Sequence, residues 1–220
     1  MDNQAEATRE KWRISSYSLT SFLLIGLLFL FSNLSADSRK TNVKYVYHVK
    51  QPDFIGHVIY PLSELAQRKN AQWIYHRHEG KYKGKTYLDE IQISLLDCGW
   101  HDVVFLSTVD PKKDYLAQKE AGLSPPPRVY VCIPIDKLEG KWAAIWSPPS
   151  VDDPSRFDDR HFELLDPMNY PCKDEVEPRT QDYYRKCALE GKKAKIFQTH
   201  ILVRGSIDIS DVPTIRWESD

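Results

Sequence analysis

An uncharged stretch near the N-terminus constrains this chain of 220 residues more than any other feature. No Asp, Glu, Lys or Arg lies between Arg13 and Asp37, and this interval contains SLTSFLLIGLLFLFSNLSA, residues 18–36. A helix of about 20 mostly apolar residues spans the roughly 30 Å hydrocarbon core of a bilayer. The sequence therefore predicts a single transmembrane helix or signal anchor over residues 17–36, preceded by an N-terminal tail of residues 1–16.

Two other interpretations of the apolar segment remain open. Its densest part, residues 22–31, is short enough for the apolar region of a cleaved secretion signal, with Leu34 and Ala36 before the cleavage point. Leu34 is larger than the residue usually found there. A buried helix of a globular domain is the third interpretation, and the lack of amphipathic spacing argues against it. An uncleaved single-pass anchor is favoured.

Basic residues flank the segment on both sides, so the positive-inside rule gives little guidance on orientation. The balance leans slightly toward a cytoplasmic C-terminal domain. The basic residues counted are Arg9, Lys11 and Arg13 before the segment, and Arg39, Lys40, Lys44 and Lys50 after it.

Charge and cysteine content exclude some functions. The formal net charge is −1 and the basic residues are scattered, so there is no strong signal for nucleic-acid binding. The four cysteines form no CxxC pair, which argues against a structural zinc site and leaves their disulfide state open; they are Cys98, Cys132, Cys172 and Cys187. His76, His78 and Glu79 could clasp a metal on an extended strand, but a solvated polar turn is the simpler interpretation, and no metal is predicted.

After a polar linker at residues 37–42, residues 43–220 have the pattern of a soluble α+β domain. Alternation of apolar and polar residues predicts strands over 43–50, 102–108, 128–135, 141–147, 194–205 and 212–217. Helices are expected over 61–69, 110–122 and 180–191, capped in the last two cases by Asp110 and Thr180. Residues 71–99 are ambiguous, and a polar stretch at 148–179 reads as a long loop. Regular βαβ alternation is missing, so a mixed or split sheet is expected rather than a doubly wound parallel one.

The expected core of this domain comes from the inward positions of these elements. It comprises Val46, Leu65, Val104, Leu106, Tyr115, Val131, Ile133, Ile145, Tyr184, Ile201 and Val203.

Two histidines on predicted strands are the main candidates for chemistry. His48 and His200 each lie within an apolar alternation, and Ser107 and Thr108 end the strand over 102–108. Alternation also places Arg204 on the same strand face as His200. Two imidazoles near hydroxyl groups can bind a sugar diol or a phosphate and can move protons near neutral pH. The structural alternative is that both histidines are half-buried residues and that the hydroxyls only cap a turn.

Three ordered motifs resemble the ADP-ribosyltransferase-like superfamily over about residues 43–217. They are YVYHV at 45–49, VFLSTVDPKKDYLAQ at 104–118 and THILVRGSIDISDV at 199–212. The best-known branch has Glu at the third signature position, where this chain has His200. The chain is therefore more similar to the branch with histidine at the first and third positions, which includes the RNA 2′-phosphotransferases.

The resemblance implies an NAD cofactor and assigns roles to five residues. His48 would hold the ribose next to the nicotinamide, Ser107 and Thr108 would line the nicotinamide pocket, and His200 would lie near the ribose or the nucleophile. Arg204 suits a phosphate, because a guanidinium matches its geometry. The missing carboxylate argues against transfer to a protein side chain and favours a phosphate acceptor or no catalysis.

Two rival functions remain open at this point. One is a metal-free ribonuclease that uses His48 and His200 as acid and base. The other is a non-enzymatic, membrane-anchored interaction or immunity-type protein in which both histidines are structural. The enzymatic interpretations require the two imidazoles to lie with Ser107 in one cleft, within about 10 Å, the reach of a small-ligand pocket.

Overall fold

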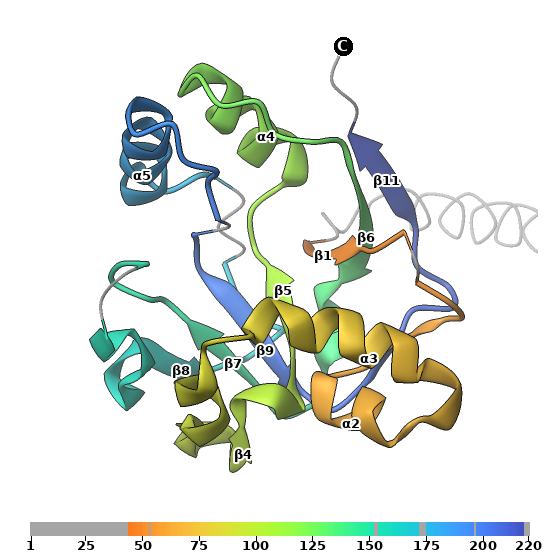
Figure 1. Ribbon diagram of the computed structural model, residues 1–220. Helices are drawn as coiled ribbons and strands as arrows, with labels where there is room; N and C mark the ends of the chain where they lie inside the picture. Colours follow the sequence, from red (N-terminus) through yellow and green to blue (C-terminus); the bar gives the residue numbers. More distant parts are fainter. Residues whose placement is uncertain (1–43, 53, 152–153, 172–174, 196, 218–220) are drawn as a thin grey trace, which may run out of the picture. The chain divides into compact units, whose positions relative to one another are not determined.

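A seven-stranded sheet in which every neighbouring pair is antiparallel forms the framework of the protein (Figure 1). The computed structural model describes residues 44–217 except 53, 152–153, 172–174 and 196. In spatial order the strands are β11 (Thr214–Trp217), β6 (Arg128–Pro134), β1 (Tyr45–Lys50), β5 (Val103–Ser107), β9 (His200–Arg204), β7 (Ala143–Trp146) and β8 (Phe162–Leu164). The α+β class is confirmed, and the sheet is antiparallel rather than mixed across the described strands.

Among the described residues, two small ladders and four α-helices lie around the sheet. The ladders pair β10 (Ile207–Asp208) with β2 (Val58–Ile59), and β3 (Gln92–Ile93) with β4 (Cys98–Gly99). Helices α2 (Leu62–Gln67) and α3 (Gln72–Glu79) lie together at one end of the sheet, and α4 (Pro111–Glu120) and α5 (Pro178–Leu189) lie together at the other (Figure 1). The 3₁₀ helices are η1 (Lys69–Ala71), η2 (Gly80–Tyr82), η3 (Thr86–Glu90), η4 (Ser94–Leu96), η5 (Trp100–Asp102), η6 (Ile135–Leu138), η7 (Pro154–Phe157) and η8 (Asp159–His161).

The predicted membrane segment cannot be compared with this framework. Among the described residues, no helix has the length and apolar character needed to cross a bilayer. The tail at 1–16, the anchor at 17–36 and the linker at 37–42 lie outside the described residues.

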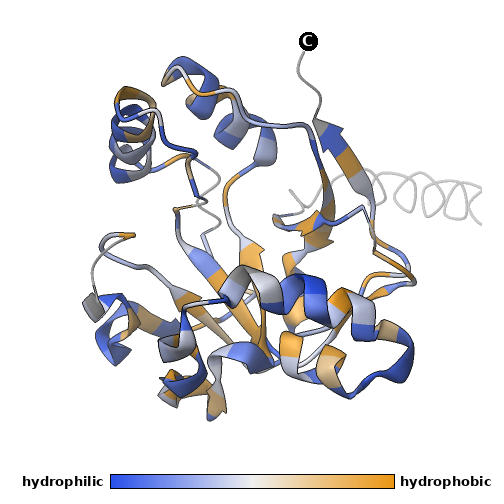
Figure 2. Cartoon of the chain, in the orientation of Figure 1, coloured by the Kyte–Doolittle hydropathy of each residue, from blue (hydrophilic) through white to orange (hydrophobic). Residues whose placement is uncertain are grey.

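Both faces of the sheet are covered, because successive side chains of a strand point to opposite sides. One face packs Val46, Leu106, Val131 and Ile201 into a core cluster. The other packs Val103, Leu202, Trp146 and Phe162 against Trp100 and the 3₁₀ turns around it. Figure 2 shows hydrophobic residues concentrated along the central strands and hydrophilic ones on the outer surfaces of the helices.

The predicted core is confirmed at most positions, with a correction on α4. Tyr115 and Leu65 are half-buried, and Ile145 packs at the margin of the first cluster. Helix α4 instead buries the polar residues Asp114 and Gln118. Their burial is tolerated because the Asp114 carboxylate accepts hydrogen bonds from the Tyr184 hydroxyl at 2.5 Å and from the Gln118 amide at 2.8 Å.

One helix start is confirmed and another is corrected. The Asp110 side chain accepts a hydrogen bond from the Lys112 backbone N–H at 2.7 Å, as an N-cap does. Helix α5 begins at Pro178 rather than after a Thr180 cap. Thr180 lies in its first turn and donates to the Phe197 carbonyl at 2.7 Å, so its hydroxyl joins α5 to the segment before β9.

The sheet is open between β1 and β5. These strands are matched at one residue pair, Tyr47 with Ser107, whereas β1 pairs with β6 along its six residues. Beyond Tyr47 the two strands diverge, and the backbone ladder between them stops. A gap in the middle of the sheet is a place where a ligand can reach the polar edges of two strands.

Candidate functional site

A cavity of about 260 Å³ lies at this opening, and three predicted site residues line it: His48, Ser107 and His200. We call it the histidine cavity. Ser107 pairs across the sheet with Tyr47 on β1 and with His200 on β9, so the end of β5 stands between the two histidine-bearing strands. The structure thus brings together side chains that are 59 and 93 positions apart in the sequence (107 − 48 and 200 − 107).

His48 reaches the cavity because of the opening between the strands. Strict alternation would place it on the face opposite Ser107, since it follows Tyr47. Its Nδ1 instead donates a hydrogen bond to the Phe105 carbonyl on β5 at 2.9 Å. The imidazole therefore lies across the gap, where a ladder hydrogen bond would otherwise form.

His200 is a neutral imidazole at physiological pH. Its Nδ1 donates to the Gln198 carbonyl at 2.7 Å, and its ring centroid lies 5.8 Å from that of Trp146 and 6.3 Å from that of Phe105. Burial lowers the pKa of His200 to about 4. Because Nδ1 carries the proton, Nε2 has the lone pair and can accept a hydrogen bond from a ligand hydroxyl.

Gln198 is a site residue that the sequence analysis missed. It lines the histidine cavity, is 2% exposed, and donates from its amide to the Ser107 hydroxyl. The Ser107 oxygen also accepts from the Val109 N–H at 3.2 Å and donates to the Val109 carbonyl at 3.1 Å. Its hydroxyl proton is therefore already used in a hydrogen bond within the protein. The Gln198 Oε1 atom is left buried with no hydrogen-bond partner. Its position two residues before His200 on an alternating stretch was the available signal.

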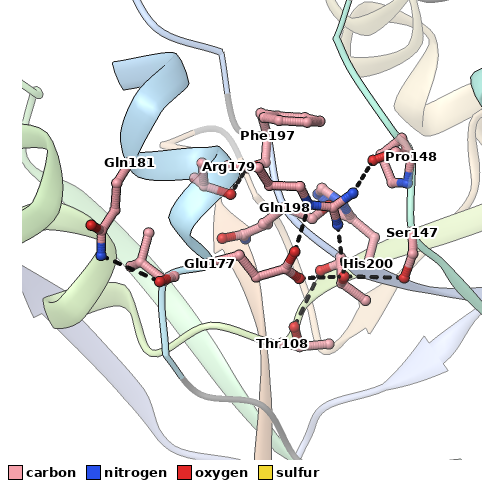
Figure 3. Close-up of polar contacts among 12 residues, drawn as sticks. Thr108, Ser147, Pro148, Glu177, Arg179, Gln181, Phe197, Gln198 and His200 are labelled. Atoms are coloured by element: carbon pink, nitrogen blue, oxygen red, sulfur yellow. Dashed lines mark hydrogen bonds and ion pairs between the residues drawn. The ribbon is translucent and has the colours of Figure 1, made fainter. Parts of the chain in front are cut away.

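A polar network fixes the segment that carries Gln198 (Figure 3). The Thr199 hydroxyl donates to the Glu177 carboxylate at 2.7 Å and lies 3.1 Å from the Ser147 hydroxyl. Arg179 pairs with Glu177 at 2.5 Å and donates to the Pro148 carbonyl. These contacts join the start of α5 and the end of β7 to the segment before β9, and so position Gln198 and His200.

Thr108 and Arg204 are not brought into the cavity. Thr108 is 1% exposed and donates to the Thr199 carbonyl at 3.2 Å, which makes it part of the packing between strands. Arg204 shares a face with His200, but four residues along a strand cover about 13 Å. Its guanidinium donates to the Leu96 carbonyl at 2.9 Å and lies 5.5 Å from the Trp142 ring centroid. Neither Thr108 nor Arg204 lines the histidine cavity.

Two further histidines line the same cavity, His78 and His101. His101 Nε2 donates to Asp89 at 2.8 Å, while the neighbouring Asp102 accepts from the Gly99 N–H at 2.8 Å. The opposite ring nitrogen of His101 is buried without a partner. No group of three or more metal-ligating side chains occurs within the described part of the chain, and His76 lies 3.4 Å from Glu79 alone.

The three cysteines in the described part of the chain do not line the cavity. Cys98, Cys132 and Cys187 are buried free thiols, and Cys172 lies outside the described residues. Burial raises the pKa of Cys132 to about 11, so this thiol is protonated and unreactive at neutral pH.

The charges of the histidine cavity limit what it can hold. Among its described lining residues there is no Lys or Arg, and the sole acid is Asp114, whose two oxygens are hydrogen-bonded to Tyr184 and Gln118. The cavity therefore suits an uncharged group, such as a sugar or a carboxamide, better than a phosphate.

Comparison with protein-family models and with curated protein sequences gives no match to this chain. The functional argument consequently depends on the geometry and charge of the site.

Proposed function

We propose that residues 43–220 bind NAD or an ADP-ribosyl group, with the nicotinamide ribose or its equivalent in the histidine cavity. The observation that carries this proposal is the meeting of His48, Ser107 and His200 at one cavity between β1 and β5. These are three of the signature positions through which the chain resembles the ADP-ribosyltransferase-like superfamily. The α+β fold with an open antiparallel sheet is compatible with that resemblance.

The histidine cavity is large enough for only part of a dinucleotide. Small-molecule pockets span about 300–1,000 Å³, and the histidine cavity measures about 260 Å³. That volume accommodates one sugar with an attached ring, and the rest of a dinucleotide would extend beyond it.

The chemistry of the site favours holding the sugar over acid–base catalysis by two histidines. His200 stays neutral because its pKa is lowered to about 4, so it cannot act as the acid of a ribonuclease near pH 7. Its Nε2 can instead accept a ribose hydroxyl. Breaking the bond between nicotinamide and ribose passes through a state resembling an oxocarbenium ion, and a site that fixes the sugar lowers the barrier to that state.

If the cavity is also catalytic, the reaction joins an acceptor oxygen to the ribose carbon and breaks its bond to nicotinamide, which leaves with the electron pair. The sole carboxylate among the described lining residues of the cavity is Asp114, and both of its oxygens already accept hydrogen bonds, so it is a poor base for the acceptor's proton. An acceptor that is already ionised, such as a phosphate, needs no such base. Because the described lining of the cavity has no Lys or Arg, a phosphate acceptor would have to reach the ribose from outside it.

Isothermal titration of the full-length protein with NAD and with ADP-ribose tests the proposal. We expect binding that weakens at least tenfold, about 1.4 kcal/mol, in His48→Ala and in His200→Ala. His57→Ala is the matched control, since His57 is an exposed histidine outside the histidine cavity and should leave the affinity unchanged. Absence of binding to either ligand would overturn the proposal and favour the interaction-protein alternative.

A further inference from the structure

A second cavity, of about 280 Å³, adjoins the histidine cavity, and His200, Gln198 and Phe105 lie on the walls of both. We call it the aromatic cavity. It extends from the shared wall toward β7 and η7. None of the functions considered for the histidine cavity involves the aromatic cavity.

Aromatic rings form the floor of this cavity. Trp100 packs edge to face with Phe157 at 5.0 Å between ring centroids, and the Trp146 and Phe157 rings are parallel to within 4°. Trp100 and Trp146 are buried, which fixes the orientation of the rings. Tyr87 stands at the rim with 45% of its surface exposed, more than a tyrosine serving only the core would show. The exposed Tyr87 ring and the half-buried Phe157 ring therefore offer flat, accessible surfaces, and the buried Trp100 and Trp146 rings support Phe157.

Positive charge surrounds these rings. Lys85, Arg156 and Lys195 line the cavity, and no Asp or Glu occurs among its lining residues in the described part of the chain. The Arg156 guanidinium lies 4.6 Å from the Phe157 ring centroid and donates to the Tyr87 hydroxyl at 3.0 Å. A chain with a formal net charge of −1 thus concentrates three cations around one hollow, next to a cavity that has none.

We propose that the aromatic cavity binds the base and phosphate of a nucleotide. Every nucleobase has a π-face that stacks on aromatic side chains, and such stacking tolerates different bases. Lys and Arg supply the charge-assisted hydrogen bonds that a phosphate accepts. The assignment goes beyond the proposed function, because the stacking and cationic residues Tyr87, Phe157, Lys85, Arg156 and Lys195 line the aromatic cavity and not the histidine cavity.

The test measures the binding of AMP to the full-length protein. Adenosine and inorganic phosphate, the two parts of AMP, are titrated separately for comparison. We expect AMP to bind more tightly than either half and to change the fluorescence of Trp100 and Trp146. Tyr87→Leu and Lys195→Gln should each weaken AMP binding about tenfold. Both residues are exposed, so the variants should fold. Lys193→Gln, an exposed lysine two residues away and outside the cavity, is the matched control.

Failure of AMP to bind, or equal binding to wild type and to both variants, would overturn the proposal. Titration of AMP into protein saturated with NAD identifies the source of the nucleotide. Competition would mean that the aromatic cavity holds the adenylate half of NAD, and simultaneous binding would mean that it holds a second ligand. If NAD does not bind at all while AMP binds as expected, the proposed function fails and the aromatic cavity stands.

Discussion

His200 is the residue whose environment is most informative. An imidazole in water titrates near pH 6.5, whereas burial lowers the pKa of His200 to about 4 in the folded protein. Below pH 6.5 the imidazole of His200 is protonated in the unfolded chain, whereas in the folded protein it stays neutral until the pH approaches 4. His200 should therefore leave the free energy of unfolding undiminished above pH 6.5 and lower it as the pH decreases toward 4.

This gives a measurable pH dependence. Between pH 7 and pH 5 the wild type should lose on the order of 2 kcal/mol of unfolding free energy through His200. His200→Gln, which has no titrating group there, should lack that part of the slope. Urea unfolding of the wild type and of His200→Gln at the two pH values checks this. Parallel slopes for wild type and His200→Gln would show that His200 titrates normally.

At the residue scale, alternation and turn chemistry predicted which strands carry His48, Ser107 and His200, but not why all three share a cavity. His48 enters it only because β1 and β5 separate, and a gap in a ladder leaves no mark in the local pattern. Thr108 and Arg204 were assigned through the resemblance, and tertiary contacts with Thr199 and Leu96 hold them elsewhere. Asp89 lies in a 3₁₀ turn 12 residues before its partner His101, a pairing that no sequence spacing indicates.

At the scale of the elements, the α4–α5 contact depends on a buried polar pair. The Tyr184 hydroxyl donates to Asp114, and burial raises the pKa of this carboxyl. Tyr184→Phe removes one partner of a buried acceptor, which typically costs about 1–3 kcal/mol. We expect a loss of unfolding free energy in that range in a urea titration at pH 7.

Tyr115→Phe on α4 is the matched control, because the Tyr115 ring is half-buried and its change removes a hydroxyl of the same kind. It should alter stability by less than about 0.5 kcal/mol. If both variants behave alike, the bond between Tyr184 and Asp114 contributes nothing to the packing of the two helices.

The long elements were predictable because their signals are strong. Period-2 alternation found β1, β5, β6 and β9, and Asp110 with Pro111 marked the start of α4. Residues 71–99 were ambiguous, since part of their apolar pattern fits both the helix and the strand period, and they form α3, a series of 3₁₀ turns and the short ladder of β3 and β4. The segment at 197–199 was assigned to a strand, but its Phe197 carbonyl instead accepts from Thr180 on α5, and its Thr199 hydroxyl contacts Ser147 after β7.

At the scale of the whole molecule, the apolar segment at residues 17–36 predicts association with a membrane. The full-length chain should sediment with membranes and resist alkaline extraction. Replacing Leu27 and Leu30 together by Arg should release it, because each Arg at the centre of a membrane helix costs about 2.5–3.5 kcal/mol. Leu27→Ile is the control. A shortened chain in the soluble fraction would instead indicate a cleaved signal.

The arrangement of the whole domain follows from an antiparallel sheet that is interrupted in its middle. The histidine cavity lies at the interruption, and the aromatic cavity adjoins it. Composition and strand order predicted the α+β class, whereas the location of the opening depends on long-range pairing that only the folded chain defines. Function in this protein is therefore expected between β1 and β5, where two strands expose their polar edges.

The most direct measurement is an NMR titration of the full-length protein with NAD, following the ring protons of each histidine. A ligand in the histidine cavity should shift the signals of His48 and His200 together, along one binding curve, while the exposed His57 stays unchanged. Signals of His48 and His200 that remain still, or that follow different binding curves, would contradict the claim that both rings contact one ligand in one cavity.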